Sequence, residues 1–384
     1  MTAVGGDLAR RLEAQAYGLG FDLVGVARLG PAETAGAFDD WLAAGYAGEM
    51  AYLARGAEKR HDTRLPSPGA LSAVVVALDY GGREPSGPVA RYARGEDYHD
   101  VLVAKLRALH AWLDDALGVP VPGKAYADTG PILERDLARR AGLGWFGKNT
   151  NLLHPRLGSF FFLGVLVLAA GLPPSAPFGA DRCGTCTRCL EACPTDAFVA
   201  PRVLDATRCV SYLTIEQRGA IPEALRAGVG DRLYGCDVCQ DVCPYNVKFA
   251  HALPDDSPFA PREALAGRNA RQLARDLLGM TQVNFSAAFR DSPMKRAKLR
   301  GLKRNAAVVL GNVGMAGDID VLTRALDDPE PLVREHALWA LNRLRDGVPR
   351  VPPAPAGAAV SELGAGPRAG DAGSGAECRD PGPH

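Results

Sequence analysis

Eight of the nine cysteines lie in one segment, between residues 183 and 243. The first four read C-x2-C-x2-C-x3-C and are followed by Pro194, which is the spacing of the bacterial ferredoxin [4Fe-4S] run. Three more read C-x2-C-x3-C and are followed by Pro244, so they match the same run without its first cysteine. Cys209 is the remaining cysteine of the segment and the candidate for the missing position. The spacing therefore predicts two [4Fe-4S] clusters.

The two runs also predict which cysteines bind each cluster. In two-cluster ferredoxins the last cysteine of each run ligates the other cluster, because the runs pack about a local pseudo-twofold axis. Applied to this chain, the rule gives two sets of four ligands, and each cysteine of the segment is used once. The first set is Cys183, Cys186, Cys189 and Cys243, and the second set is Cys209, Cys236, Cys239 and Cys193.

Two structural zinc sites are the alternative, since Zn²⁺ also accepts four thiolates at C-x2-C spacing. Zinc explains neither the three-cysteine spacing of the first run nor the proline after each closing cysteine. A brown colour and visible absorbance near the blue end of the spectrum would distinguish [4Fe-4S] clusters from zinc. The ninth cysteine, Cys378, lies in a Pro-, Gly- and Ala-rich tail and is interpreted as a surface thiol without a role.

The composition is that of a globular protein, with 47% hydrophobic and 23% charged residues. Lys+Arg and Asp+Glu both number 44, so any nucleic-acid contact must come from a local basic patch. The N-terminus shows no export signal, and the longest apolar run, residues 160–170, is too short for a membrane helix. We expect a cytoplasmic protein without a membrane partner, whose reduced thiols favour metal sites over disulfides.

The elements around the cysteines predict an α+β protein in four parts. Residues 1–175 combine an N-terminal amphipathic helix with β-rich runs at 22–28, 72–80 and 158–170, which indicates an α+β domain. Residues 176–260 form the ferredoxin-like cluster module. Residues 261–348 are predicted to be helical, and 318–345 reads as two helices around an Asp-Asp-Pro-Glu-Pro turn, like a HEAT repeat. Residues 349–384 are predicted to be a disordered tail.

A glycine-rich stretch, GLGWFGKN at 142–149, resembles both a dinucleotide-binding motif and a P-loop. Each of those motifs needs a strand before it and a helix after it. Here an amphipathic helix, 131–142, precedes the stretch and an apolar strand follows. The stretch is therefore not interpreted as a phosphate site, and Gly142 is interpreted as a helix C-cap.

Two titratable residues attract attention in the N-terminal domain. Asp128 precedes the helix at 131–142, and by sequence alone a helix N-cap is favoured over a catalytic acid there. His99 lies in a near match to the D-x-H-x-x-G pattern that provides a histidine ligand to cobalt, but Leu102 stands where the glycine belongs. His99 is therefore interpreted as an ordinary, partly exposed histidine.

A cluster of six cations lies within ten residues near the start of the helical region, with no acid among them. A solvated helix face and a phosphate-contacting surface are both open readings of such a cluster. The six cations are Lys295, Arg296, Lys298, Arg300, Lys303 and Arg304.

Several stretches taken together resemble the epoxyqueuosine reductase family. They are ADTGPILERDLARRAGLGWFGKNTNLL at 127–153, the double cysteine run, CVSYLTIEQRG at 209–219, CDVCQDVCPYN at 236–246 and the HEAT-like end. Ferredoxins share the cysteines alone, whereas this family shares the order of all these stretches, and the resemblance covers about residues 5–347. It implies a cobalamin-dependent oxidoreductase of the bacterial cytoplasm that reduces the epoxide of epoxyqueuosine in the anticodon loop of tRNA, the last step of queuosine synthesis.

The resemblance also implies roles for individual residues. Electrons from a low-potential donor would pass through the clusters to cobalamin, whose reduced form opens the epoxide. Asp128 would be the proton donor, with its pKa raised by burial under the corrin ring. The cations at 295–304 would grip tRNA phosphates, and a monomer is expected. The cofactor contacts implied are Arg60, Tyr98, Asp128, Asn151, Ser159, Ser211, Tyr212, Thr214 and Glu216.

Two other functions compete with this one. A reductive dehalogenase-like enzyme would share cobalamin and two clusters, but the HEAT-like end and the lack of an export signal argue against it. An electron carrier or scaffold would use the clusters and helices alone, but it leaves the block at 127–153 without a purpose.

Overall fold

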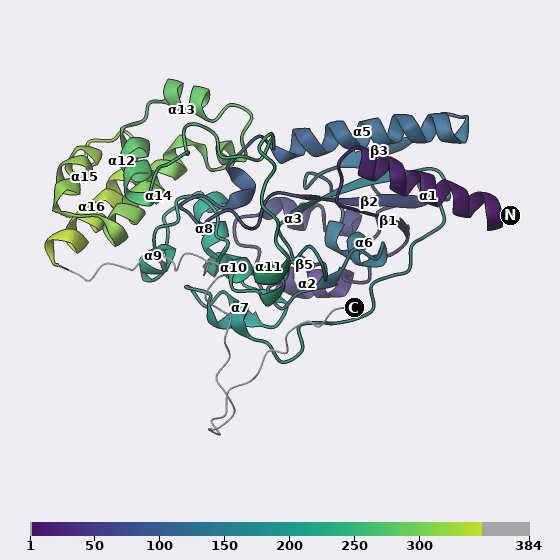
Figure 1. The fold of residues 1–384 in the computed structure, drawn as a ribbon. Coiled ribbons are helices and arrows are strands. Elements are labelled where there is room, and N and C mark those ends of the chain that lie inside the picture. The colour runs from purple at the N-terminus through teal and green to yellow at the C-terminus, as the bar shows by residue number, and fades with distance from the viewer. Residues whose placement is uncertain (1, 348–384) are drawn as a thin grey trace, which may run out of the picture.

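A computed structural model describes residues 2–347 of the chain. The molecule is α+β, with a sheet at one end, a bundle of helices at the other and the cysteine-bearing segment between them (Figure 1). The predicted disordered tail, 349–384, and Cys378 lie outside the described residues. No helix among residues 2–347 combines the length and apolar character needed to cross a membrane.

The sheet has four antiparallel strands in the order β1-β2-β6-β3. They are β1 (Leu23–Arg28), β2 (Ser72–Asp79), β6 (Phe161–Leu168) and β3 (Gly123–Tyr126). The three β-rich runs predicted from sequence are thus β1, β2 and β6. The central strands are apolar over 73–78 in β2 and throughout β6, because helices cover both faces of the sheet.

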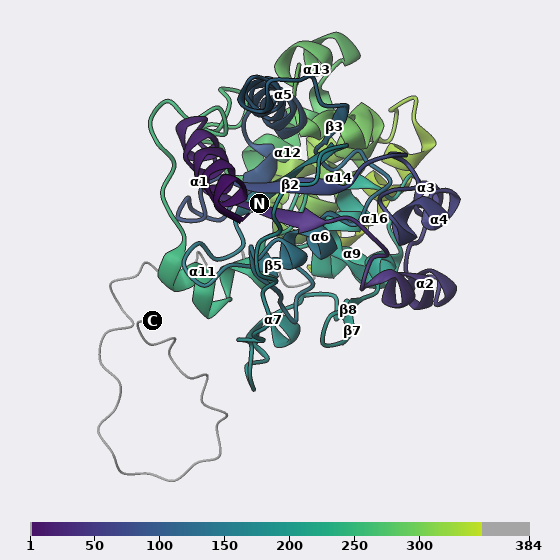
Figure 2. The ribbon, with the colours of Figure 1, turned by 90° about the vertical axis from the view of Figure 1, so that its right-hand side faces the viewer.

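Helices α1 (Thr2–Gly18) and α5 (Tyr98–Leu117) cover one face of the sheet, and α6 (Glu134–Arg140) covers the other (Figures 1 and 2). Alternate residues of β2 point to opposite faces, so Val74 packs with the first pair of helices and Val75 with α6. The predicted N-terminal amphipathic helix is confirmed, since Leu12 and Ala16 are buried. Three short helices lie between β1 and β2: α2 (Ala35–Ala43), α3 (Ala51–Arg55) and α4 (Ala57–His61).

The cysteine-bearing segment consists of short elements. Each cysteine run contains one helical turn, α7 (Arg188–Glu191) in the first and α10 (Val238–Asp241) in the second, and the two turns pack together. The rest is α8 (Val210–Ile215), α9 (Glu223–Val229), α11 (Pro244–Phe249) and a hairpin of β7 (Phe198–Ala200) and β8 (Val203–Leu204). The segment also contains the 3-10 turn η2 (Ala206–Arg208), whereas the 3-10 turn η1 (Arg91–Ala93) precedes α5 in the N-terminal domain.

The C-terminal part is helical, as predicted. Helix α14 (Lys298–Val313) packs between α12 (Ala270–Gly279) and α16 (Pro331–Arg345), and α15 (Ile319–Ala325) packs on α16. The acidic, proline-containing turn separates α15 from α16, so the HEAT-like pair is present and α12 and α14 supply a second layer. The remaining elements are α13 (Gln282–Ala288), η3 (Pro293–Ala297) and η4 (Ala316–Asp318).

The stretch around the glycine-rich motif differs in detail from the prediction. The helix begins at Glu134 rather than 131, because the residues from Asp128 to Leu133 form a non-helical loop. Gly142 adopts φ 86° directly after the C-cap, as its interpretation as a terminator required. The motif then forms a small hairpin, β4 (Trp145–Phe146) and β5 (Leu152–Leu153), with no helix after it. The rejection of a P-loop is therefore confirmed.

Candidate functional site

The eight cysteines surround two hollows, and the division matches the two sets that the ferredoxin rule predicts. A hollow of about 330 Å³ is lined by Cys183, Cys186, Cys189 and Cys243. A larger pocket of about 450 Å³ is lined at one end by Cys193, Cys209, Cys236 and Cys239. The last cysteine of each run thus lies with the first cysteines of the other run, because the two helical turns pack side by side.

The chain provides a polar setting for both sets of sulfurs. The indole N–H of Trp145 lies 3.5 Å from Cys183 Sγ, and the amide of Ala197 donates to Cys193 Sγ at 3.3 Å. Burial raises the pKa of Cys189 to about 11 and that of Cys236 to about 12. Thiols this poor at ionising become thiolate ligands only beside strong positive charge, which the irons of a cluster supply. Donor set and setting both fit [4Fe-4S] clusters.

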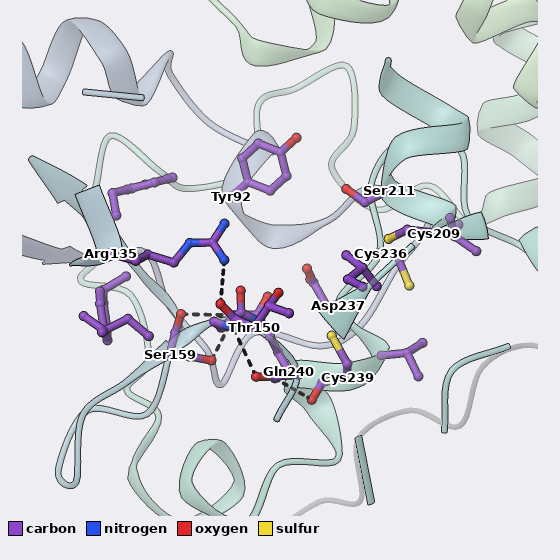
Figure 3. Close-up of a pocket in the computed structure, with 18 of the residues that line it drawn as sticks. Tyr92, Arg135, Thr150, Ser159, Cys209, Ser211, Cys236, Asp237, Cys239 and Gln240 are labelled. Atoms are coloured by element: carbon purple, nitrogen blue, oxygen red, sulfur yellow. Dashed lines mark hydrogen bonds between the residues drawn. The ribbon is translucent and has the colours of Figure 1, made fainter. Parts of the chain in front are cut away.

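The larger pocket extends from the second cysteine set to the N-terminal domain (Figure 3). Five of the predicted cofactor residues line it: Tyr98, Asp128, Asn151, Ser159 and Ser211. Arg135 reaches across the same space and donates to the carbonyl of Thr150. Sulfur atoms and the candidate acid thus face one pocket, so electrons leaving the second cysteine set have a short way to the candidate cofactor contacts.

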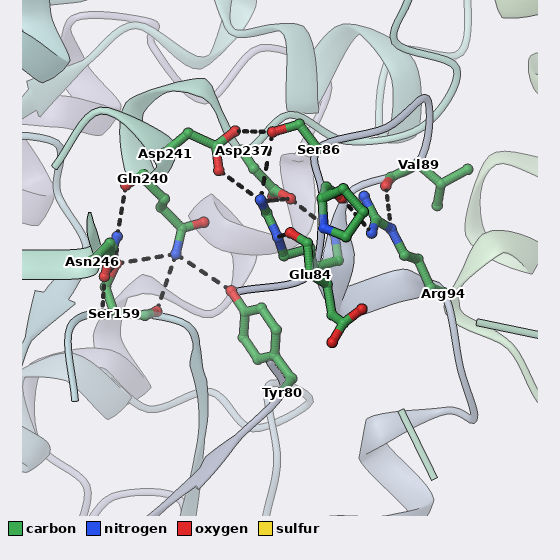
Figure 4. A network of polar contacts seen from close by, with 12 residues as sticks. Tyr80, Glu84, Ser86, Val89, Arg94, Ser159, Asp237, Gln240, Asp241 and Asn246 are labelled. Carbon is green, nitrogen blue, oxygen red and sulfur yellow. Dashed lines mark hydrogen bonds and ion pairs between the residues drawn. The ribbon is translucent and has the colours of Figure 1, made fainter. Parts of the chain in front are cut away.

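A buried amide network holds the second cysteine run against the sheet (Figure 4). Gln240 donates to the carbonyl of Ser159 at 3.0 Å and to the Tyr80 hydroxyl at 3.3 Å. Asn246 accepts the Ser159 amide at 2.6 Å and donates to the Ser159 hydroxyl at 2.9 Å. Because Ser159 is tied in this way, it positions the cysteine run as well as lining the pocket.

An ion-pair cluster fixes the same run from the other side (Figure 4). The Arg91 guanidinium is 3.0 Å from Asp237 and 2.7 Å from Asp241, and all three side chains are largely buried. The Arg91 amide also donates to Asp237 at 2.9 Å. Charged hydrogen bonds of this kind are stronger than neutral ones, so Cys236 and Cys239 are held between two rigid networks.

Asp128 is not a helix N-cap, so that sequence-based interpretation is wrong. The N-cap of α6 is Leu133, and Asp128 lies in the preceding loop with φ 58°, a left-handed conformation uncommon for a residue other than glycine. The Tyr98 hydroxyl donates to its carboxylate at 2.8 Å, and His99 Nε2 lies 3.8 Å from it. The side chain is 71% exposed toward the pocket. A strained loop thus presents the carboxylate to the open space.

The charge on His99 decides the state of Asp128. Burial disfavours the imidazolium, but Asp128 and Asp97 outweigh burial and raise the pKa of His99 to about 9. The protonated ring in turn holds the pKa of Asp128 below its usual range. In the chain without cobalamin the pKa of Asp128 is therefore lowered, whereas the resemblance implied a pKa raised by burial under a corrin ring. His99 is partly exposed, as the sequence indicated, but it is coupled to the candidate acid.

Glu134 is a pocket residue to which the sequence reasoning gave no role. It is the first residue of α6 and lines the pocket with Asp128. Its Oε1 is buried without a hydrogen-bond partner in the described part of the chain. Burial raises the pKa of Glu134 to about 8. The available signal was the stretch DTGPILER at 128–135, in which Glu134 follows Asp128 by six residues.

Four predicted cofactor contacts do not line the pocket. Arg60 is buried behind it, and its charge lowers the pKa of Glu134 without outweighing burial. The Thr214 hydroxyl is fully buried and bonds to Val210 O and Gly235 N, so the prediction of a direct contact is wrong for Thr214. The Tyr212 hydroxyl accepts the amide of Glu49.

Glu216, the fourth, forms two hydrogen bonds of 2.8 Å with Arg296. The side chains of Tyr212, Thr214 and Glu216 therefore serve mainly in packing, hydrogen bonding and ion pairing, because α8 turns them away from the pocket.

The six cations divide into three groups. Lys295, Arg296, Lys298 and Arg300 are exposed. Lys303 pairs with Asp328 at 2.8 Å. Arg304 is fully buried, and its guanidinium donates to the carbonyls of Leu213, Gln217 and Gly219. The prediction that Arg304 contacts phosphate is wrong, because the periodicity of α14 turns it inward.

Comparison with known proteins identifies relatives over nearly the whole described chain. Residues 182–246 match the family model described as 4Fe-4S double cluster binding domain, which supports iron–sulfur clusters over zinc. Residues 60–129 match the model described as Epoxyqueuosine reductase QueG, DUF1730.

An epoxyqueuosine reductase of Alicycliphilus denitrificans is 40% identical over 360 residues, covering 87% of this chain and 97% of the relative. One of Pseudomonas aeruginosa is 39% identical over 347 residues, covering 88% and 94%.

Solved structures agree with these matches. A crystal structure of epoxyqueuosine reductase with a tRNA-Tyr epoxyqueuosine-modified stem loop superposes with a TM-score of 0.79 at 31% identity, covering 88% of this chain and 91% of the other. The Bacillus subtilis enzyme, with its catalytic aspartate loop swung out of the active site, gives a TM-score of 0.77 at 29% identity over the same shares.

Proposed function

Because the chain belongs to the epoxyqueuosine reductase family, we propose that it reduces the epoxide of epoxyqueuosine in tRNA to give queuosine, the last step of queuosine synthesis. The observation that carries the proposal is the pocket that joins the second cysteine set to Asp128. It brings an electron source and a proton source to one space, which is what reductive removal of an oxygen atom requires.

The pocket is also the proposed cobalamin site. Tyr98, Asn151, Ser159 and Ser211 line it between the cysteines and the candidate acid. Backbone and hydroxyl groups of this kind suit the amides of a corrin ring. When bound, reduced cobalamin supplies a nucleophile strong enough to open a strained epoxide. The proposed cluster ligands are the two sets of four cysteines around the two hollows.

Asp128 is the proposed proton donor to the epoxide oxygen. Its loop places the carboxylate at the open face of the pocket, within reach of His99, which holds a proton at neutral pH. Tyr98 orients the carboxylate through its hydroxyl. A carboxylate beside an imidazolium can pass that proton to a developing alkoxide, so the pair acts as one acid. The Bacillus subtilis relative also carries its catalytic aspartate on a loop.

The exposed cations at 295–300 are the proposed tRNA contact. They lie in η3 and at the start of α14, and Arg296 is tied to Glu216, close in sequence to the second cluster. Closely spaced cations displace counterions from a phosphate backbone. A relative of this chain has been crystallised with a modified stem loop, which supports tRNA as the partner.

The resemblance further supports a cytoplasmic monomer that takes electrons from a low-potential donor. Size-exclusion chromatography with light scattering tests the oligomeric state, and reduction of the clusters by candidate donors tests the electron source.

Turnover is the direct test of the proposed function. The reconstituted protein is reduced, mixed with cobalamin and tRNA from cells lacking epoxyqueuosine reductase, and the nucleosides are analysed by mass spectrometry. Conversion of epoxyqueuosine to queuosine is expected. A protein that reduces cobalamin but leaves epoxyqueuosine intact would instead be an electron carrier, and loss of halide from a halogenated phenol would indicate a dehalogenase.

A further inference from the structure

The proposed reaction consumes two protons at one oxygen atom. When an epoxide becomes an alkene, both C–O bonds break, a C=C bond forms, and the oxygen leaves as water. Two electrons, delivered from the low-potential donor through the clusters, and two protons balance the change. Asp128 with His99 accounts for one proton, so a second acid is required in the same pocket.

Glu134 is placed to be that acid. It lines the pocket with Asp128, at the point where the loop enters α6. Its Oε1 is buried and lacks a hydrogen-bond partner among the described residues. A buried carboxyl oxygen without a donor is costly when ionised but tolerable as a neutral acid. The site therefore keeps a proton on Glu134.

We propose that Glu134 donates the second proton, the one that lets the oxygen leave as water; this inference rests on the proposed function. The proton held by His99 and Asp128 goes to the epoxide oxygen as the first C–O bond breaks, so that the bridging oxygen becomes a hydroxyl. The proton of Glu134 then goes to that hydroxyl as the second C–O bond breaks. Glu134 is left as a carboxylate, and solvent reprotonates both acids between turnovers.

The charges around Glu134 determine whether it keeps its proton until the second C–O bond breaks. Asp128, on the loop after β3, raises the pKa of Glu134, whereas a hydrogen bond from the backbone amide of Glu134 itself, Arg135 on the same helix and Arg60 on α4 lower it. Burial is the largest influence, and the pKa is about 8. While Asp128 is ionised, its charge helps Glu134 to retain its proton. At neutral pH the site thus holds two protons, one on His99 beside Asp128 and one on Glu134.

A purely structural role is the alternative. Glu134 is the first residue of α6, and an acidic residue there interacts favourably with the helix dipole. Such a role predicts an ionised carboxylate and a loss of stability on substitution, but no change in how turnover depends on pH. The proton-donor role predicts a neutral carboxyl group at pH 7.

The test compares Glu134→Gln and Glu134→Asp with Glu58→Gln, an exposed glutamate in the first turn of α4. In the protein without cobalamin, infrared difference spectra between pH 6 and pH 10 should show a carboxylic acid that ionises near pH 8. Glu134→Gln should remove that band, and Glu58→Gln should not. Circular dichroism establishes that each variant is folded.

Turnover of epoxyqueuosine tRNA gives the second measurement. Wild type and Glu58→Gln should lose activity as the pH rises through about 8, because Glu134 loses its proton. Glu134→Gln should be slower by about 10²-fold at pH 7 and lose the fall in activity near pH 8, keeping only the later fall near pH 9 at which His99 loses its proton, whereas Glu134→Asp should retain most activity.

Loss of stability with an unchanged pH profile in Glu134→Gln, or a spectrum without the band in wild type, overturns the inference. Failure of wild type to convert the substrate overturns the proposed function itself.

Discussion

Replacing Arg304 with methionine separates a structural arginine from a nucleic-acid contact. Arg304 lies in the basic cluster at 295–304, yet its guanidinium is fully buried and donates to three backbone carbonyls between Leu213 and Gly219. Methionine has a similar length and no donors. The substitution therefore removes the donor from one buried and two part-buried carbonyls in the stretch that follows Cys209, and from the buried Oδ1 of Asn305.

The expected loss of stability follows from these contacts. An unpaired buried acceptor costs about 1–3 kcal/mol and a part-buried one less, so the two buried and two part-buried acceptors together cost about 6 kcal/mol. Burial lowers the pKa of Arg304 to about 10 from 12.5, which means that the buried charge itself costs the fold about 3 kcal/mol. Removing the charge recovers that amount. A net loss of about 3 kcal/mol remains, equivalent to a fall in melting temperature of roughly 4 °C for a folded part of this size.

The assay compares Arg304→Met with Arg300→Ala, since Arg300 is exposed on the same helix. Melting is followed by circular dichroism and by the visible absorbance of the clusters. Affinity for the tRNA stem loop is measured over a range of salt concentrations. Arg300→Ala should melt like wild type and lower the slope of log affinity against log salt by about 0.7–0.9 for one lost phosphate contact. Arg304→Met should melt at a lower temperature than wild type. Measured at a low temperature at which it is still folded, it should keep the wild-type slope of log affinity against log salt.

The reverse pattern would refute this reasoning. If Arg304→Met melted with wild type and bound tRNA with a reduced salt slope, the guanidinium would be reaching phosphate rather than the three carbonyls. The assignment of α14 as a structural helix would then be wrong.

Three further predictions concern the remaining parts of the site. Asp128→Asn should lower single-turnover conversion by about 10²–10⁴-fold with unchanged tRNA affinity, and full activity in this variant would remove Asp128 from the mechanism. Cys209→Ala should halve the iron bound per chain and abolish the reduction of cobalamin, which is followed by its visible absorbance. Iron at the wild-type level would exclude Cys209 as a ligand. Asp318→Ala should cost about 3–5 kcal/mol in urea denaturation, because Asp318 is fully buried between Arg271 and Arg275; a midpoint equal to wild type would show that these pairs contribute nothing.

Local patterns in the sequence were sufficient for three of the four strands of the main sheet, for the N-terminal helix, for the helical C-terminal part and for the cysteines. Strands β2 and β6 are unbroken apolar runs, and such runs are buried wherever they pair. The spacing within each cysteine run is imposed by the cluster, so it can be read without the fold. The placement of Cys209 beside Cys236 was also predictable, because it was the one cysteine of the segment left to complete the second run.

Side-chain direction in the short elements could not be predicted in this way. Helix α8 has six residues, too few for a periodic pattern to show which face is buried, and Thr214 turned out to point inward. Asp128 adopts a left-handed conformation, which aspartate tolerates better than most residues but adopts at only a few positions of this chain, so residue type alone did not predict it. Arg304 is charged and buried, a combination that depends on carbonyls 85 or more residues away in the chain.

The residues whose positions the sequence did not predict show how the C-terminal helices support the redox site. Besides Arg304, the Asn305 side chain donates to the carbonyls of Thr214 and Leu233 at 2.8 and 2.9 Å. The His336 ring accepts the amide of Ile221 at 3.1 Å, and burial lowers its pKa to about 4, so it stays neutral and able to accept. Helices α14 and α16 therefore hold the chain between Cys209 and Cys236 by buried hydrogen bonds. A HEAT-like unit that merely gripped tRNA would not need such bonds. In this protein the same helix, α14, carries at its start exposed cations, which are the proposed tRNA contact, and further along it holds the stretch between Cys209 and Cys236, the proposed ligands of the second cluster. Under the proposed function, substrate binding and electron delivery therefore depend on one element.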